Sequence, residues 1–377
     1  MSESQMLVFW GVVFGRFAVP LAIPRYPLPA IFAALLLDGL DQTLFETFTE
    51  LDLGGYQSYD KALDIYYLAL AYIAMFRNWR NLLAFRAGRF LWYYRLTGVA
   101  LFELSGWRPL LLIFPNTFEY FFIFYEAVRL RWSPHRLTKR LIVLAAAVIW
   151  LFVKLPQEYW IHIARLDTTD FIKTQILGAS LSTPWPTVLA DNLWLIPVLT
   201  LLAIALVLAV RWLLERLPPA DQSPDAEAEP AGEAITGHTA PRQFFSLMLL
   251  EKIVLVSLVG IIFAQILPEM QVTNLQLATG TAFAIALNSL LSQALARRTL
   301  WVAFPAMALV NLGPILLYLF LSPGFEGSVN RNNLIFFVLL LTLIVVLFDR
   351  YYPAYRRRHE ARESEAAAGR PISPRPG

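Results

Sequence analysis

Long apolar stretches separated by short polar segments run through most of the chain. A helix needs about 20 mainly apolar residues to cross the hydrocarbon core of a bilayer. By this criterion the pattern predicts an all-α, polytopic integral membrane protein with about eleven transmembrane helices. The predicted spans cover residues 6–22, 28–48, 61–76, 84–104, 108–128, 138–154, 192–215, 244–266, 274–296, 299–321 and 333–349.

Polar segments predict how these helices are grouped. Residues 218–241 are rich in Pro, Ala, Asp and Glu, which is typical of a disordered linker, here a cytoplasmic one. We therefore predict a seven-helix bundle over 1–217 and a four-helix bundle over 242–350. The charged and then Pro-rich residues 351–377 predict a disordered cytoplasmic tail. Residues 157–178 mix aromatic, aliphatic and charged side chains, which predicts an amphipathic helix on the outer membrane surface.

Lys and Arg gather in alternate loops and so predict the orientation. Segments 77–89 and 129–140 carry four and five basic residues and no acid. Segment 45–60 carries four acidic residues and no base. Because cytoplasmic loops hold an excess of Lys and Arg, we expect the N-terminus outside and the C-terminus in the cytoplasm, in a multi-pass protein of the cell membrane.

Composition supports the membrane class. Hydrophobic residues make up 57% of the chain and charged residues 16%, whereas soluble domains carry about 25% charged residues. The net charge of +3 is small and the basic residues cluster in loops. We interpret this basicity as topology information, and we expect membrane lipid as a partner and no nucleic acid.

The sequence predicts neither a metal site nor a cofactor. The chain has no Cys, which excludes disulfides, Cys-ligated metals and a thiolate nucleophile. None of the four His residues lies in the middle of an apolar span, which argues against a bis-His haem site inside the membrane. His162, Asp167 and Asp170 lie close together in the sequence, but a solvated amphipathic face is the favoured explanation for them.

The first five predicted helices carry charged side chains deep in the apolar stretches. A charge at the bilayer centre costs about 2.5–3.5 kcal/mol on insertion scales, so it normally faces a bundle interior and has a partner. Asp38 and Asp41 are three residues apart, which places them on one helix face. The deep acids are Asp38, Asp41, Asp64 and Glu119, and the deep bases are Arg16 and Arg95.

These acids outnumber the bases, and that surplus suggests a function. Close carboxylates resist joint ionisation, so at least one should hold a proton or face a cation. We therefore predict a proton, ion or polar-solute site at the four acids, with the two arginines as charge partners. Asp38 and Asp41 would carry the proton or ion, Glu119 would assist, and Arg95 would tune their protonation.

Pro115 lies within the predicted span 108–128, four residues before Glu119. Proline removes a helical hydrogen bond and frees a carbonyl one turn earlier. The sequence therefore predicts a kink beside a buried acid. Such a kink often lines a cavity, but neighbouring helices satisfy it equally often.

Three classes of function fit this pattern. The first is a transporter- or channel-like protein. The second is a membrane-embedded enzyme acting on a lipid or lipid-linked substrate, with carboxylates as acid and base or as ligands of a divalent ion near Asp60, Asp64 and Glu103. The third is a structural or assembly subunit, in which Arg–Asp and Arg–Glu pairs only hold helices together.

Overall fold

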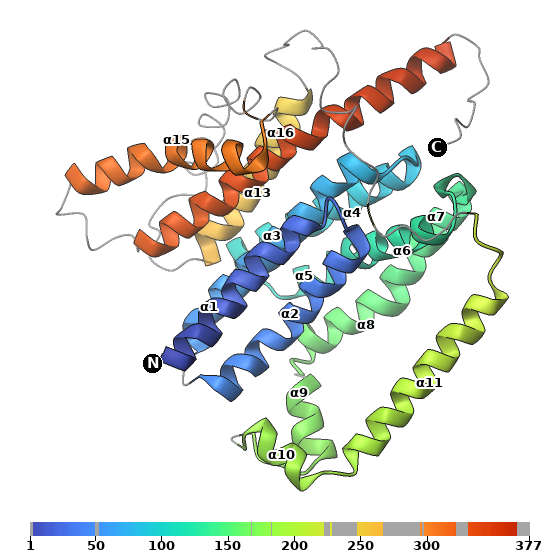
Figure 1. Cartoon of the computed structure of the whole chain (residues 1–377), viewed down its shortest axis with the longest axis vertical. Helices are drawn as coiled ribbons and strands as arrows, with labels where there is room; N and C mark the ends of the chain where they lie inside the picture. Colours follow the sequence, from blue (N-terminus) through green and yellow to red (C-terminus); the bar gives the residue numbers. More distant parts are fainter. Residues whose placement is uncertain are drawn as a thin grey trace.

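The computed structural model of the chain describes residues 3–49, 53–166, 168–181, 183–221, 227, 247–266, 295, 298–321 and 331–367. Every regular element among these residues is helical (Figure 1), in agreement with the all-α prediction. Most of the predicted linker 218–241 and of the predicted span 274–296 lies outside the described residues.

The first half of the chain alternates long helices with short turns. Its elements are α1 (Glu3–Ala18), the 3-10 helix η1 (Val19–Ala22), α2 (Pro27–Phe48), α3 (Leu53–Asn78), α4 (Leu82–Ser105), α5 (Pro109–Ile113), α6 (Thr117–Arg131) and the 3-10 helix η2 (Pro134–Arg136). Prolines mark the join between α1 and α2: Pro20 lies in η1, and Pro27 is the first residue of α2. Proline suits a first helical position because its missing N–H would have no partner there.

The rest of the chain, from Lys139 onward, contains both very short and very long elements. They are α7 (Lys139–Val148), the π-helix η3 (Ile149–Lys154), α8 (Leu155–Glu158), the π-helix η4 (Tyr159–Ile163), α9 (Thr168–Phe171), the π-helix η5 (Ile172–Ile176), α10 (Trp185–Asp191), α11 (Leu195–Arg216), α13 (Leu247–Ile266), α15 (Leu300–Leu321) and α16 (Arg331–Ala367).

Helix α3 is the centre of the fold. From Ala62 to Phe76 every residue except Asp64 is buried. A helix that is apolar on all sides needs neighbours all round, and α3 packs against α2, α4, α6, α13 and α16 (Figure 1). The hydrophobic core is therefore built around this one helix.

Helix α4 has a clear signal at each end. The Asn81 side chain accepts hydrogen bonds from the backbone N–H groups of Leu83 and Ala84, as an N-cap does. Gly106 ends the helix with φ +67°, in the left-handed region that glycine adopts at little cost. These two residues limit α4 to 24 residues.

The predicted kink at Pro115 is a complete break. The predicted span 108–128 forms two helices, α5 of five residues and α6, separated by residues 114–116. Backbone groups at the break bond to side chains instead of to the helix. Tyr94 donates its hydroxyl to the Ile113 carbonyl at 2.8 Å. Arg95 Nη1 donates to the Phe114 carbonyl at 3.0 Å.

The predicted span 138–154 continues further than expected. Elements α7, η3, α8 and η4 form one helical segment, Lys139–Ile163, of 25 residues, which we call the α7–η4 helix. The predicted surface helix 157–178 is correspondingly divided. Its first part belongs to the α7–η4 helix, and its later part forms the short elements α9 and η5. Arg165, with φ +54°, lies in the turn between them.

The C-terminal helices share the core of the N-terminal ones. Helix α16 packs against α3 and α13 packs against α4 (Figure 1). Phe348 and Tyr352 of α16 contact Phe76 of α3, with ring centroids 5.3 and 5.1 Å apart. Within the described residues, the predicted parts 1–217 and 242–350 are thus joined by one hydrophobic cluster.

Helix α16 also extends into the predicted disordered tail 351–377, which is helical as far as Ala367. A tertiary contact explains this difference. Arg358 donates to the carbonyl oxygens of Phe76 and Trp79, the latter at 3.3 Å. The last carbonyls of a helix lack partners within it, so Arg358 caps the end of α3 and holds the extended helix in place.

By length and composition, four helical segments among the described residues are apolar enough to span a bilayer: Glu3–Ala22, Lys139–Ile163, Leu195–Arg216 and Ile335–Arg358. Helices α2, α3 and α4 are similarly long, with 22, 26 and 24 residues. Each carries at least three charged residues, however, which lowers its hydropathy. The full set of eleven spans stays a prediction.

Replacing Gly98 of α4 with Ala should force α4 away from the break after α5. A Cβ at this position would overlap the Cβ of Phe114, and overpacking of this kind costs about 1–3 kcal/mol. Thermal unfolding in detergent should therefore show a lower midpoint for G98A. In G11A, where a Cβ meets nothing within 4 Å, the midpoint should stay the same or rise. Equal midpoints for G98A and the wild type would contradict this packing.

Breaking the ion pair between α13 and α16 should destabilise the fold strongly. Lys252 Nζ lies 3.0 Å from each carboxylate oxygen of Asp349, and both side chains are buried. Removing one partner of a buried pair costs about 3–5 kcal/mol, because the other charge loses its counter-charge. K252M should lower the denaturation midpoint, and the double variant K252M/D349L should regain most of the loss. A double variant as unstable as K252M would show that the pair is not the cause.

Candidate functional site

Four aspartates converge on the guanidinium of Arg16. Nη1 contacts Asp41 and Asp60, and Nη2 contacts Asp38 and Asp64, the last at 2.7 Å. We call these five residues the Arg16 cluster. The structure thus brings Arg16 together with three of the four predicted acids and adds Asp60.

The three helices that form the cluster fix its geometry. Arg16 lies in the last turn of α1. Asp38 and Asp41 project from one face of α2, because residues three apart are neighbours on a helix. Asp60 and Asp64 share a face of α3 in the same way, four residues apart. Tyr66 of α3 donates a hydrogen bond to the Phe17 carbonyl at 3.0 Å, which holds α3 against the end of α1.

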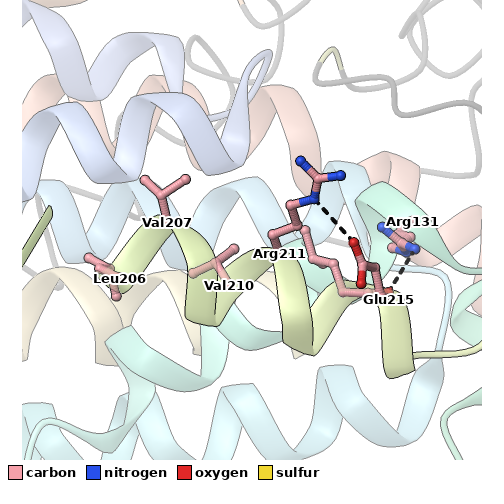
Figure 2. A pocket seen from close by; sticks show the side chains of 7 residues that line it. Arg131, Leu206, Val207, Val210, Arg211 and Glu215 are labelled. Atoms are coloured by element: carbon pink, nitrogen blue, oxygen red, sulfur yellow. Dashed lines mark hydrogen bonds and ion pairs between the residues drawn. The ribbon is translucent and has the colours of Figure 1, made fainter. Parts of the chain in front are cut away.

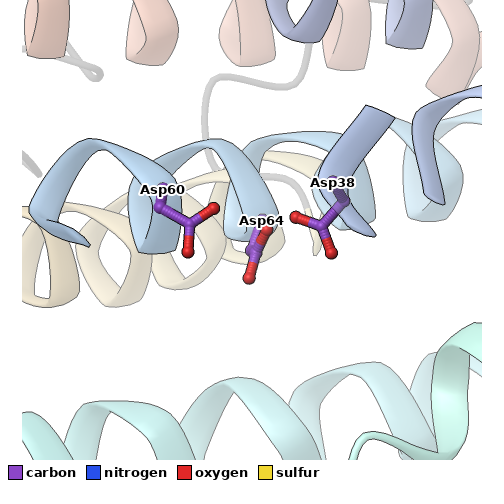
Figure 3. A group of neighbouring side chains, drawn as sticks. All are labelled: Asp38, Asp60 and Asp64. Atoms are coloured by element: carbon purple, nitrogen blue, oxygen red, sulfur yellow. The ribbon is translucent and has the colours of Figure 1, made fainter. Parts of the chain in front are cut away.

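The cluster has a buried side and an open side. The side chains of Arg16 and Asp41 are only 3% and 4% exposed. Those of Asp38, Asp60 and Asp64 are 29%, 37% and 39% exposed. Figure 3 shows the last three carboxylates, from α2 and α3, directed toward a common region. A small ion can therefore reach these three carboxylates while Arg16 remains enclosed.

The open carboxylates are also close enough to share a cation. One oxygen from each of Asp38, Asp60 and Asp64 lies within 4.8 Å of the others. Hard cations such as Mg²⁺ and Ca²⁺ prefer carboxylate oxygens as ligands. The sequence predicted no metal site. The carboxylates of Asp38, Asp60 and Asp64 are nevertheless suited to share a proton or to bind a hard cation.

Glu119 lies in a second polar group, between α3, α6 and the α7–η4 helix. It accepts hydrogen bonds from the Tyr67 hydroxyl and the Asn116 side-chain amide, both at 2.7 Å. Lys154 Nζ lies 3.6 Å from Glu119 Oε2. Tyr67 lies three residues after Asp64 on α3, which makes the two neighbours on one helix face. Glu119 is therefore a neighbour of the Arg16 cluster and not a member of it.

Arg95 does not contact the predicted acids. Its Nη1 lies 3.7 Å from Glu158 Oε1, and the same nitrogen donates to the Phe114 carbonyl. Glu158 also accepts the backbone N–H of Asn116 at 3.0 Å and contacts His162 Nε2 at 3.0 Å. The role of charge partner expected for Arg95 is filled by Arg16, and Arg95 instead stabilises the break at Pro115.

Lys154 and Glu158 belong to this second group, although the sequence pattern did not predict it. The predicted span ended at residue 154, whereas the helix continues to Ile163. Both side chains are buried. Lys154, Glu158 and His162 follow one another at intervals of four, which is the spacing of one face of a continuing helix. That spacing was the available signal. The π-helical turns η3 and η4 lie on either side of Glu158, and such turns often occur at functional sites.

The sequence analysis favoured a solvated amphipathic face, and not a metal site, for His162, Asp167 and Asp170. His162 contacts Glu158, and Asp170 lies on the separate short helix α9. Asp167 is outside the described residues. Glu103, expected near Asp60 and Asp64, lies 3.6 Å from the Lys61 ammonium.

Replacing Arg16 should damage the protein more than replacing Arg95. R16Q leaves four carboxylates without this counter-charge, and breaking a buried ion pair costs about 3–5 kcal/mol. R95Q loses a hydrogen bond to Phe114, worth about 1.5–3 kcal/mol, and the 3.7 Å contact with Glu158. Glu158 keeps His162 and the backbone N–H of Asn116 as partners, so we expect a smaller loss than for R16Q. Chemical denaturation in detergent should rank the variants in this order, and R16Q/D41N should recover part of the loss. The reverse ranking would show that Arg95 holds the essential charge.

No protein-family model matches the sequence, and no curated protein or solved structure shows significant similarity to it. Any assignment of function must therefore come from the geometry of the two polar groups.

Proposed function

We propose that this chain is a multi-pass protein of the cell membrane that binds and passes a proton, a small cation or a polar solute at the Arg16 cluster. The proposal includes the predicted topology of eleven spans, with the N-terminus outside and the C-terminus in the cytoplasm. In this proposal Asp38, Asp60 and Asp64 hold the transported species and Arg16 keeps them together.

One observation carries the proposal: three partly exposed carboxylates surround a buried guanidinium. Four carboxylates against one guanidinium leave three negative charges in surplus if all are ionised. Close carboxylates cannot all stay ionised without compensation. Protons or a bound cation would supply it, and both can reach the open side of the cluster.

The Glu119 group extends this polar region along the bundle. Tyr67 bonds to Glu119 and lies three residues from Asp64 on α3, so the two side chains are neighbours on one helix face. From Glu119 the polar side chains continue through Lys154, as the 3.6 Å contact shows. Ionisable residues inside a membrane protein commonly mark ion or proton pathways, and this continuity supports a pathway over an isolated structural ion pair.

A transport assay tests the proposal directly. Purified protein in liposomes should exchange protons or a small cation, followed with a pH-sensitive dye and with Na⁺, K⁺, Mg²⁺ and Ca²⁺ gradients. D38N/D64N should slow the exchange about tenfold or more, because each lost charge-assisted contact is worth about 1.5–3 kcal/mol. Asp191 is exposed at the end of α10, so D191N is the control and should behave as the wild type. Normal exchange by a folded D38N/D64N would exclude this site.

A membrane-embedded enzyme is the second candidate, because the oxygens of Asp38, Asp60 and Asp64 lie within 4.8 Å of one another. Three carboxylates at that spacing suit a divalent ion that would bind a lipid-linked phosphate. Lipid conversion that requires Mg²⁺ or Mn²⁺, together with no ion exchange in liposomes, would favour the enzyme. The purely structural role predicts neither activity.

A further inference from the structure

Helix α11 is unlike every other long helix that the structure describes. It is strongly apolar, and none of its residues is buried against the described part of the chain. Figure 1 shows it standing apart from the α7–η4 helix, with α9 and α10 at one end. The side of the α7–η4 helix is also rich in exposed apolar residues, among them Leu144, Leu151 and Phe152. Both helices thus present apolar surface that is costly to expose to water.

The position of α11 is nevertheless fixed by contacts at its C-terminal end and just after it. Arg131, at the end of α6, donates to the Leu214 carbonyl at 3.3 Å. Trp132 Nε1 donates to the Pro218 carbonyl at 3.1 Å. The backbone N–H of Ser133 donates to Asp221 at 3.0 Å. The helix is therefore held near one end, while its middle remains separate from the bundle.

A groove of about 630 Å³ lies where α11 approaches the end of α6 (Figure 2). Leu206, Val207 and Val210 of α11 form its apolar part. Arg131 and Arg211 lie at the other end of the groove. An elongated apolar surface that ends in cationic groups has the pattern of a phospholipid, in which acyl chains lead to a charged headgroup.

The charge at the polar end of the groove favours an anion. Arg211 pairs with Glu215 at 3.1 Å. Arg131 has no carboxylate partner among the described residues, and its buried Nε has no hydrogen-bond acceptor there. Within the described part of the chain, the groove therefore carries one net positive charge. A phosphate group matches an arginine well, because a guanidinium offers several N–H donors in one plane.

The predicted topology places this end of the groove at a suitable depth. Arg131 belongs to the basic segment 129–140, which the distribution of charges assigns to the cytoplasmic side. The cytoplasmic leaflet carries anionic lipids, whose headgroups attract arginines near the surface. A headgroup beside Arg131 would leave the acyl chains alongside Val207 and Leu206, in the hydrocarbon region.

We propose that the groove between α11 and the bundle holds one anionic phospholipid, with its phosphate on Arg131 and its acyl chains along Leu206, Val207 and Val210. The lipid covers exposed apolar side chains of α11 and connects α11 to the end of α6. This site is separate from the Arg16 cluster and does not depend on its function.

Native mass spectrometry of the full chain in detergent, with added phosphatidylglycerol or phosphatidylcholine, tests the proposal. The wild type should retain one phosphatidylglycerol in preference to phosphatidylcholine. R131Q should lower that preference about tenfold, since a hydrogen bond to a charged group is worth about 1.5–3 kcal/mol. Arg140 is an exposed base of the same segment that does not line the groove, so R140Q should bind as the wild type does.

A second pair of variants tests the apolar part. V207W places a bulky ring in the groove and should reduce binding of both lipids, whereas L208W changes a neighbouring exposed residue outside the groove and should not. Equal retention of both lipids by the wild type would overturn the proposal. So would unchanged lipid binding in folded V207W, or a dimer that V207W disrupts in protein free of lipid, which would assign the groove to a second copy of the chain.

Discussion

The burial of Arg16 among four aspartates is the interaction on which the arrangement of the first three helices depends. A buried charged side chain needs a counter-charge within the protein, and Arg16 receives it from α2 and α3. The contacts fix the rotation of both helices about their axes, because Asp38 and Asp41 must face α1 together with Asp60 and Asp64. The same arrangement leaves more negative than positive charge at one place, and this imbalance is what gives the cluster a possible chemistry.

The same constraint explains the second polar group. Pro115 interrupts the helix, and the backbone groups freed at the break find partners among side chains. Tyr94, Arg95 and Glu158 supply hydrogen bonds to the backbone at the break. Glu158 can reach this point only because the α7–η4 helix continues past Lys154. The break and the long helix with its π-helical turns are therefore parts of one structure, and Glu119 lies beside it.

The long helices of the fold are packed in two different ways. Helix α3 is enclosed by protein, and α13 and α16 are fixed to its neighbourhood by aromatic contacts and by the buried Lys252–Asp349 pair. Helix α11 is held near its end and presents apolar side chains on every face. The phospholipid proposed for its groove would complete the packing of α11, with the phosphate on Arg131.

The sequence by itself determined the all-α class, the presence of helices long and apolar enough to cross a bilayer, and the surplus of acids in the first part of the chain. These follow from apolar length and from the rarity of charges in lipid, which are properties of each segment alone. Only the tertiary structure decided that Arg16 and not Arg95 faces Asp38, Asp41 and Asp64. It also decided that Glu119 belongs to a separate group and that Arg358 caps α3. Each of those outcomes depends on the rotation and contact of helices distant in the sequence, which a periodic pattern within one helix does not specify.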